Sequence, residues 1–282
     1  MKQLPLDAFT QAVQALREVT VNCYFARSVA EKHVAGSIYV DDVAFPRAFY
    51  IVHPYGMSLL YGNVHDEFLH SELKDHLLGL RGLRKAAEWM QVFPSEIEAR
   101  IDRMLGDRLI PCDDDRGRDN PGVAVVKHER VNFTFKPDRF EGFKRGIDLA
   151  HYEIREVDAD LFNRIDGTVV PKKFWNNASD FISHGAGFSL MVDGQAAATA
   201  FSSFRHDGIL ELGLETRPAF RERGFACVVT ARLIEYCLER GLEPVWSCRR
   251  GNQGSYNLAV KSGFEPIRHL PFYELILPEK PV

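Results

Sequence analysis

The chain has 282 residues, of which 45% are hydrophobic and 26% charged, and its formal net charge at pH 7 is −4. This composition is typical of a globular protein, and the small negative charge gives no reason to expect a nucleic acid as a partner. At this length a single hydrophobic core has reached its usual limit, so we expect two domains. No uninterrupted apolar stretch of about 20 residues occurs and the N-terminus lacks the apolar run of a signal peptide, so we expect a cytoplasmic protein without a membrane partner.

Cysteines and aspartates give no sign of a metal. The five cysteines are an odd number and contain no C-x-x-C pair, which argues against a disulfide framework and against a zinc site. The adjacent Asp113, Asp114 and Asp115 lack the spacing of a calcium loop, and we interpret them as a solvated acidic turn. No metal is therefore expected.

The first half of the chain mixes helical and strand patterns. Residues 7–19 place apolar side chains at helical spacing, which predicts an amphipathic helix. The apolar runs 49–52 and 57–61 flank a short turn and predict two strands. A capping box at Ser95 and Glu98 predicts the start of a later helix.

In the second half, strands and helices alternate. Four strands are predicted, the first three joined by turns into a meander: 188–192, 197–204, 209–216 and 244–248. Helices are predicted over 222–240, which ends before Gly241, and over 254–261. The fold class predicted is α/β (α+β), with a mixed α/β domain over residues 1–145 and, over 146–282, a mixed sheet flanked by helices.

The segment from Leu210 to Ala226 carries the strongest chemical signal, because it predicts a strand, a short turn and a helix start. Arg221 and Arg223 would lie near the positive end of the helix dipole, which is unfavourable unless an anion binds there. Gly224 has no Cβ, so a phosphate could approach the free N–H groups of the first turn. The alternative is a solvated helix end. Neither a P-loop nor a G-x-G-x-x-G motif after a strand occurs in the chain.

Two motifs give this half a family resemblance. Arg221-x-x-Gly224-x-Ala226, after a strand and Pro218, resembles the pyrophosphate loop of the GNAT superfamily of N-acetyltransferases. Residues 252–264 resemble the second motif of that superfamily, an Asn, a small residue three positions later and a closing Gly-Phe. Residues 211–216 and 244–248 are similar to the GNAT branch that includes the zwittermicin-resistance acetyltransferases, and that likeness extends to residues 48–62.

The resemblance implies that acetyl-CoA binds as a co-substrate. By resemblance, Leu214 and Thr216 would offer backbone groups to the pantetheine arm. The pyrophosphate would be held by six consecutive residues: Arg221, Glu222, Arg223, Gly224, Phe225 and Ala226. Asn252 and Ser255 would touch the CoA arm, although for Asn252 a helix N-cap is the alternative. Trp246 would either line the acyl pocket or lie in the core.

Catalysis requires a base, because an alkylamine with a pKa near about 10 is mostly protonated at neutral pH. Alternation along 209–216 puts Glu211 and Glu215 on one face of the strand. We predict Glu211 as the base, since it lies ten residues before Arg221, close to where some GNAT enzymes carry a glutamate; a solvated or ion-paired strand residue is the alternative. Many members have a tyrosine as general acid where this chain has Ala259, so Tyr256 or water is expected to take that role.

The predicted function is transfer of an acetyl group from acetyl-CoA to an amine of a small molecule or peptide. The alternative is a non-catalytic acyl-CoA-binding sensor or partner-binding module, and a CoA hydrolase is a weaker third reading. The domain over residues 1–145 has no Arg-x-x-Gly-x-Gly/Ala sequence, so we expect it to bind no CoA and to shape the acceptor site or the oligomer. The oligomeric state stays open, with a homodimer as one option.

Overall fold

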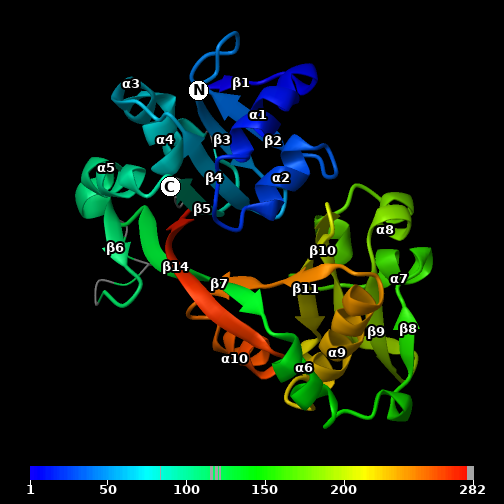
Figure 1. The fold of residues 1–282 in the computed structure, drawn as a ribbon. Coiled ribbons are helices and arrows are strands. Elements are labelled where there is room, and N and C mark those ends of the chain that lie inside the picture. Colours follow the sequence, from blue (N-terminus) through cyan, green and yellow to red (C-terminus); the bar gives the residue numbers. More distant parts are fainter. Residues whose placement is uncertain (83, 115–116, 118–119, 121, 278–282) are drawn as a thin grey trace. The chain divides into compact units, whose positions relative to one another are not determined.

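The computed structural model of the chain describes residues 1–82, 84–114, 117, 120 and 122–277, and it consists of two compact units (Figure 1). Unit 1 comprises Met1–Arg130, Arg249–Gly251 and the chain from His269 onward. Unit 2 comprises Val131–Cys248 and Asn252–Arg268. The chain therefore passes from unit 1 to unit 2 earlier than the expected 145/146 boundary, and its C-terminal part returns to unit 1. The predicted turn around Asp113–Asp115 lies partly outside the described residues.

Unit 1 is a sheet with helices on both faces. Its strands are β1 (Lys2–Gln3), β2 (Ser37–Val40), β3 (Ala48–Val52), β4 (Met57–Gly62), β5 (Glu88–Phe93) and β6 (Leu109–Pro111). Its helices are α1 (Phe9–Leu16), α2 (Tyr24–Ala30), α3 (Asp66–Phe68), α4 (Lys74–Leu77) and α5 (Glu96–Leu105). Short 3-10 or π turns are η1 (Leu6–Ala8), η2 (Leu69–Leu73), η3 (Leu80–Gly82) and η4 (Gly106–Arg108).

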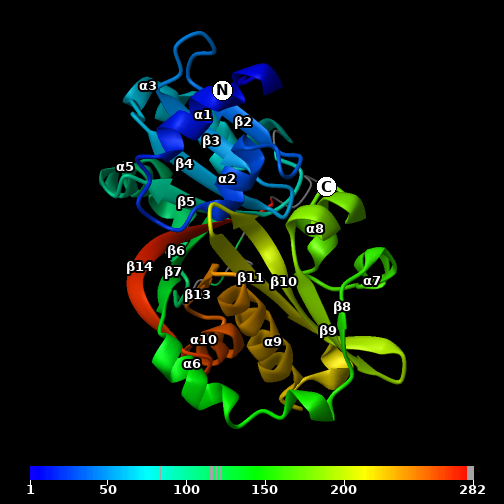
Figure 2. The same ribbon diagram turned by 45° about the vertical axis from the view of Figure 1, so that its right-hand side comes forward.

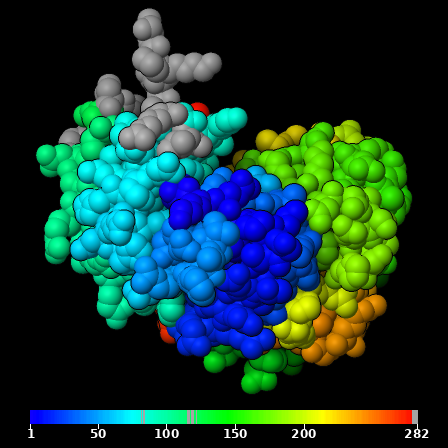
Figure 3. Space-filling view, turned by 90° about the horizontal axis from the view of Figure 1, so that it is seen from above, coloured from blue at the N-terminus to red at the C-terminus, as the bar shows by residue number. Residues whose placement is uncertain are grey.

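The two faces of the unit 1 sheet follow from strand alternation. Phe49 and Ile51 belong to the apolar cluster that includes α1 and α2, whereas Tyr50 belongs to the cluster that includes α3, α4 and α5. The N-terminal segment and α1, drawn in blue, lie on the surface of this unit (Figure 3), and α1 turns Phe9 and Leu16 inward. Ser95 precedes α5 but makes no side-chain capping bond, so the predicted capping box does not form.

Unit 2 has the same layered construction. Its strands are β8 (Ile154–Glu156), β9 (Gly187–Val192), β10 (Gln195–His206), β11 (Ile209–Thr216) and β12 (Glu243–Val245). Its helices are α6 (Pro137–Lys144), α7 (Ala159–Arg164), α8 (Ala178–His184), α9 (Phe225–Glu239) and α10 (Gln253–Lys261), with short turns η5 (Leu149–His151), η6 (Pro171–Lys173) and η7 (Pro218–Phe220). Helix α9 packs on one face of this sheet, where Val229 and Leu233 contact the apolar side chains of β9, β10 and β11 (Figure 2). Phe181 of α8 lies on the other face.

The two units repeat one order of elements. Each runs strand, two helices, three strands, helical crossover, strand and helix, from β1 to α5 in unit 1 and from β8 to α10 in unit 2, where β13 is added between β12 and α10. The strand pairing repeats as well, because β1 to β4 and β8 to β11 pair antiparallel while β4–β5 and β11–β12 pair parallel. Unit 2 is therefore a second copy of the topology of unit 1.

Two long strands run from one unit into the other. Strand β7 (Val125–Phe135) starts in unit 1 and ends in unit 2, while β14 (Phe264–Leu275) starts in unit 2 and ends in unit 1. With β13 (Ser247–Arg249) they complete the strand order β1-β2-β3-β4-β5-β14-β7-β13, and β6 pairs with β7. Each unit is thus completed by a strand from the other half of the sequence.

The predicted fold class is confirmed, since two mixed sheets are flanked by helices. Among the described residues, no helix combines the length and the apolar character needed to cross a bilayer.

Candidate functional site

Strand β11 divides the candidate site by the direction of its side chains. Leu210, Leu212 and Leu214 pack with the cluster around α9. Glu211, Gly213 and Glu215 alternate with these leucines and point to the face away from α9. A Cβ on Gly213 would meet the Phe201 ring on that face. The two glutamates therefore share one face, as predicted.

Among the residues that the structure describes, one backbone edge of β11 has no strand partner along its second half. Strand β11 pairs with β12 only as far as Glu211, which lies opposite Val245. The Arg217 N–H donates to the Ala197 carbonyl of β10 at 3.0 Å, and the Gly208 carbonyl accepts from the N–H of Glu243, the first residue of β12. Because backbone groups alternate along a strand, those of Leu212, Leu214 and Thr216 point away from β10, toward the edge that has no strand partner. This edge could accept an extended, amide-containing arm, which fits the role implied for Leu214 and Thr216.

The open edge leads into a loop of free amide groups. Among the described residues, none of the backbone N–H groups from Glu222 to Ala226 donates a hydrogen bond. Glu222 has φ +64° and Gly224 has φ +78°, and Gly224 is the N-cap of α9 without a side-chain cap. Alternating left-handed residues turn successive N–H groups toward one concave point, which is a common way to bind an anion. The loop therefore offers backbone donors suited to a phosphate.

These positive φ angles also correct the predicted helix. Helix α9 begins at Phe225, three residues later than the predicted start at Glu222. Arg221 and Arg223 consequently lie in the loop before the helix and not in its first turn. The side chain of Phe225 is half-buried and its ring lies 6.4 Å from that of Phe220, so this residue offers the loop only its backbone.

Three exposed arginines surround the loop. Arg221 donates through Nε to the Thr216 carbonyl at 3.2 Å, and its Nη2 lies 3.9 Å from the Glu215 carboxylate. The guanidinium groups of Arg223 and Arg217 lie over the Phe220 ring, at 5.6 Å and 5.9 Å from its centroid. Positive charge at the N-terminus of a helix adds to the dipole, so the local field favours a bound anion.

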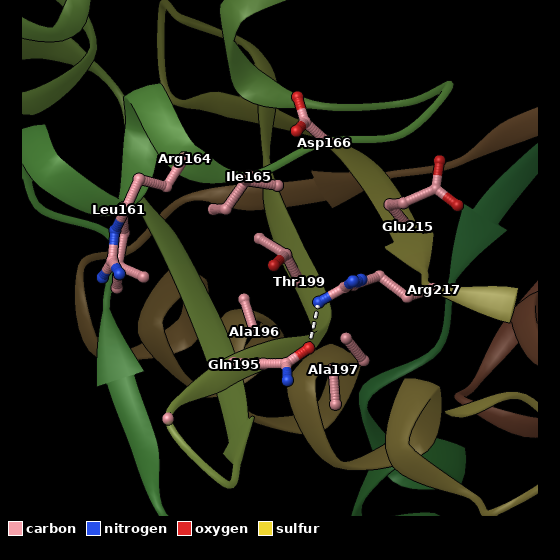
Figure 4. A pocket seen from close by; sticks show the side chains of 12 residues that line it. Leu161, Arg164, Ile165, Asp166, Gln195, Ala196, Ala197, Thr199, Glu215 and Arg217 are labelled. Carbon is pink, nitrogen blue, oxygen red and sulfur yellow. Dashed lines mark hydrogen bonds between the residues drawn. The ribbon is translucent and has the colours of Figure 1, made fainter. Parts of the chain in front are cut away.

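A small cavity of about 170 Å³ lies at the end of β11, where Glu215 and Arg217 line it (Figure 4). It is lined by the end of α7, the start of β10 and the end of β11, and Arg217 closes one side by donating to Gln195 at 2.7 Å. Typical ligand pockets measure about 300–1,000 Å³, so this cavity is too small for a coenzyme.

Glu211 has the burial and the partner of a positioned carboxylate. It is 7% exposed, and its Oε1 accepts a hydrogen bond from the Ser247 hydroxyl at 2.9 Å. Strand β10 bulges opposite it at Ser203, whose hydroxyl donates to the Glu211 backbone carbonyl at 3.1 Å. These contacts fix the position of the carboxylate, as proton transfer from a bound group requires.

Glu215 on the same face is already used for structure. Its Oε2 accepts the backbone N–H groups of Thr168 and Val169, both at 2.8 Å. A Cβ on Gly167 would lie 2.7 Å from the Glu215 Cγ, so the loop is built around this side chain. Glu215 is therefore held by backbone donors of the loop, whereas Glu211 is held by the Ser247 hydroxyl.

Helix α10 brings the second motif to the same region, with structural bonds already made. The Asn252 side chain accepts from the Ser255 N–H at 3.2 Å and caps the helix, which is the alternative considered for it. The Ser255 hydroxyl accepts from Trp246 Nε1 at 3.1 Å, and Trp246 is a core residue, 3% exposed. Tyr256 is half-buried with its ring edge-on to Phe133. Contacts of Asn252, Ser255 and Tyr256 with CoA stay a proposal.

Two members of the site were missed from the sequence. Ser247 lay within a predicted strand, and only its hydrogen bond to the Glu211 carboxylate shows its hydroxyl to be relevant. Arg217 was given no role, although its spacing from Arg221 and Arg223 could have identified a third cation.

The corresponding region of unit 1 lacks these features. Strand β4 pairs with β5 as far as Tyr61, opposite Phe93, so its edge is closed nearly to its end at Gly62. The following helix is capped by His65, which accepts from the Phe68 N–H at 3.3 Å, and its first turn is acidic. These features disfavour a phosphate.

Comparisons with known proteins agree on one family. The chain is 25% identical over 253 residues to an uncharacterized N-acetyltransferase, YdfB, of Bacillus subtilis, covering 88% of this chain and 89% of that protein. It shares the fold of a GCN5-related N-acetyltransferase-like protein from Streptococcus suis, with a TM-score of 0.68 at 19% identity, over 96% of this chain and 99% of that one. A GNAT-family acetyltransferase from Colwellia psychrerythraea gives a TM-score of 0.58 at 11% identity, over 97% and 98% of the two chains.

The family model described as GNAT acetyltransferase matches residues 17–273, which include most of both units. The open strand edge, the loop of free amides and this match lead to one conclusion: the chain belongs to the GNAT acetyltransferase family.

Proposed function

We propose that the chain is an N-acetyltransferase that moves the acetyl group of acetyl-CoA to an amine of a small molecule or peptide. The observation that carries this proposal is the open edge of β11, which leads directly into the unpartnered N–H groups of Glu222 to Ala226. An extended amide-rich arm ending in a pyrophosphate has matching chemistry along its whole length.

Each part of the coenzyme has a proposed contact. The pantetheine amides would pair with backbone groups of Leu214 and Thr216, and the pyrophosphate would accept from the loop amides. Arg221 and Arg223 would add charge-assisted bonds to the phosphate oxygens. To reach Asn252 or Ser255, the CoA arm would have to use groups other than those already engaged in the helix cap and with Trp246.

Glu211 would act as the general base. The acceptor nitrogen must lose a proton to attack the thioester carbonyl, and Glu211 would accept it while the Ser247 hydroxyl keeps the carboxylate in place. A C–N bond forms and the C–S bond breaks. The leaving thiolate, with a pKa of about 8.5, would take a proton from Tyr256 or water.

Unit 1 would contribute to the acceptor site or to an oligomer and bind no CoA, which its closed β4 edge and acidic helix start support. We also propose that the chain lies in the GNAT branch that includes the zwittermicin-resistance acetyltransferases, on the likeness of residues 211–216 and 244–248. That branch assignment leaves the acceptor itself undetermined.

The test is release of free CoA thiol from acetyl-CoA with a panel of amines, with the acetylated product identified by mass spectrometry. We expect thiol release that depends on one class of amine. Tight binding of acetyl-CoA without any amine-dependent turnover would favour the non-catalytic module, and equal release without an amine would favour a hydrolase.

A further inference from the structure

A second group of polar side chains, on one face of the unit 1 sheet at β5, β14, β7 and β13, has no part in the proposed chemistry. We propose that this face binds a ligand through a carboxylate group that is flanked by an N–H donor, as in an amino acid or a peptide terminus. This site goes beyond the proposed acetyl transfer.

The first observation is a guanidinium group without an acidic partner. Arg249 of β13 lies over the Trp89 ring of β5, 5.1 Å from its centroid. Among the described residues, Arg249 forms no ion pair. Both side chains are half-buried, so the cation is held in place and still accessible. A stacked arginine of this kind keeps its planar donor edge free for a carboxylate.

The second observation is the buried side chain of Gln91. It is 1% exposed, and within the described residues neither its Oε1 nor its Nε2 has a hydrogen-bond partner. Gln91 lies two residues after Trp89 on β5, so both point to the same face. Buried amides are nearly always satisfied in native proteins, and one that is not calls for an explanation. A ligand that accepts from Nε2 and donates to Oε1 would provide it.

The carboxylate of Glu274 on this face is engaged by a histidine, and a second guanidinium, that of Arg130, lies 5.3 Å from the centroid of the Phe272 ring. Glu274, opposite Trp89 in the β5–β14 register, lies 3.0 Å from His128 Nε2 and is engaged with that imidazole. Phe272 stacks 5.1 Å from Trp89 and extends the aromatic floor. These surroundings favour a carboxylate over a cation as the ligand group. A carboxylate would neutralise the Arg249 charge, and the carboxylate of Glu274 is already engaged with His128.

The experiment uses the full chain without acetyl-CoA, so that its outcome does not depend on turnover. Binding of a panel of dipeptides and of the same dipeptides as C-terminal amides is measured by calorimetry. The variants are Arg249→Met and Gln91→Leu, and Arg250→Met is the control because it removes the same charge from the exposed next residue. Calorimetry with acetyl-CoA alone tests the coenzyme site separately.

We expect at least one free acid to bind about 10-fold or more tightly than its amide, as charge-assisted bonds predict. Arg249→Met should abolish that preference and Arg250→Met should keep it. Gln91→Leu should also abolish it while raising the midpoint of thermal unfolding, since it removes unsatisfied buried atoms. A merely structural Gln91 would not affect the preference for the acid.

Kinetics then separate two sources of the carboxylate. If it belongs to the acceptor, Arg249→Met raises KM for the free acid and leaves kcat unchanged; if it belongs to a separate ligand, calorimetric affinity falls without a change in KM. The proposal is overturned if the wild-type protein shows no preference for the acid across the panel, or if Arg249→Met retains it.

Discussion

Replacing Gly224 by alanine tests the phosphate loop with the smallest change. Gly224 has φ +78°, and a Cβ placed there would have no atom within 4 Å. The substitution therefore costs stability only through the left-handed backbone, about 1–2 kcal/mol. In the acetyl-CoA complex the same methyl group would lie where the pyrophosphate approaches the N–H groups of the loop. We expect at least about a 10-fold loss of acetyl-CoA affinity, or 1.4 kcal/mol.

Gly241 provides a matched control at the other end of the same helix. It has φ +65° and would likewise place a Cβ in open space. Gly241→Ala should lower the free energy of unfolding by a similar amount and leave acetyl-CoA affinity unchanged. Urea unfolding gives the stability of each variant and calorimetry gives its Kd. Equal effects of the two substitutions on Kd would refute the loop assignment.

Three further predictions concern charge and protonation. The double variant Arg221→Ala, Arg223→Ala should fold but bind acetyl-CoA a few kcal/mol more weakly, at about 1.5–3 kcal/mol per contact, and unchanged calorimetric affinity would remove this contact. Glu211→Gln should lower kcat about 100-fold or more with acetyl-CoA affinity retained; near-wild-type turnover from pH 6 to 9 would contradict its role as base. Burial lowers the pKa of His53 from 6.5 to about 3, so the unfolded chain takes up a proton first as pH falls below 6.5. Unfolding free energy should therefore fall by about 2 kcal/mol from this group between pH 7 and 5, and urea titrations should show a smaller fall in His53→Asn.

Local pattern predicted much of unit 2. The alternation of Leu210, Leu212 and Leu214 with two glutamates predicted β11 over its full length, since one face packs on α9 and the other does not. The predicted strand 244–248 is divided at Trp246, because β12 pairs with β11 whereas β13 belongs to the other sheet. Periodicity cannot reveal which sheet a strand joins.

Long-range pairing explains what the sequence did not show. Strand β14 returns to pair with β5, so Tyr273 lies opposite Met90 although they are far apart in the chain. The buried bonds of the Glu88 carboxylate to Tyr50 and His76 likewise join residues whose spacing carries no pattern. The difference between Glu211 and Glu215 also depended on tertiary structure, since only the loop at Thr168 shows that Glu215 accepts backbone N–H groups.

A crystal structure of the full chain with acetyl-CoA tests the central claim most directly. The pyrophosphate oxygens should lie within hydrogen-bond distance of the N–H groups between Glu222 and Ala226, with the pantetheine arm along the open edge of β11. The thioester should lie near Glu211, and unit 1 should hold no coenzyme. Coenzyme bound at the β4 edge of unit 1, or bound in unit 2 away from this loop, would contradict the account.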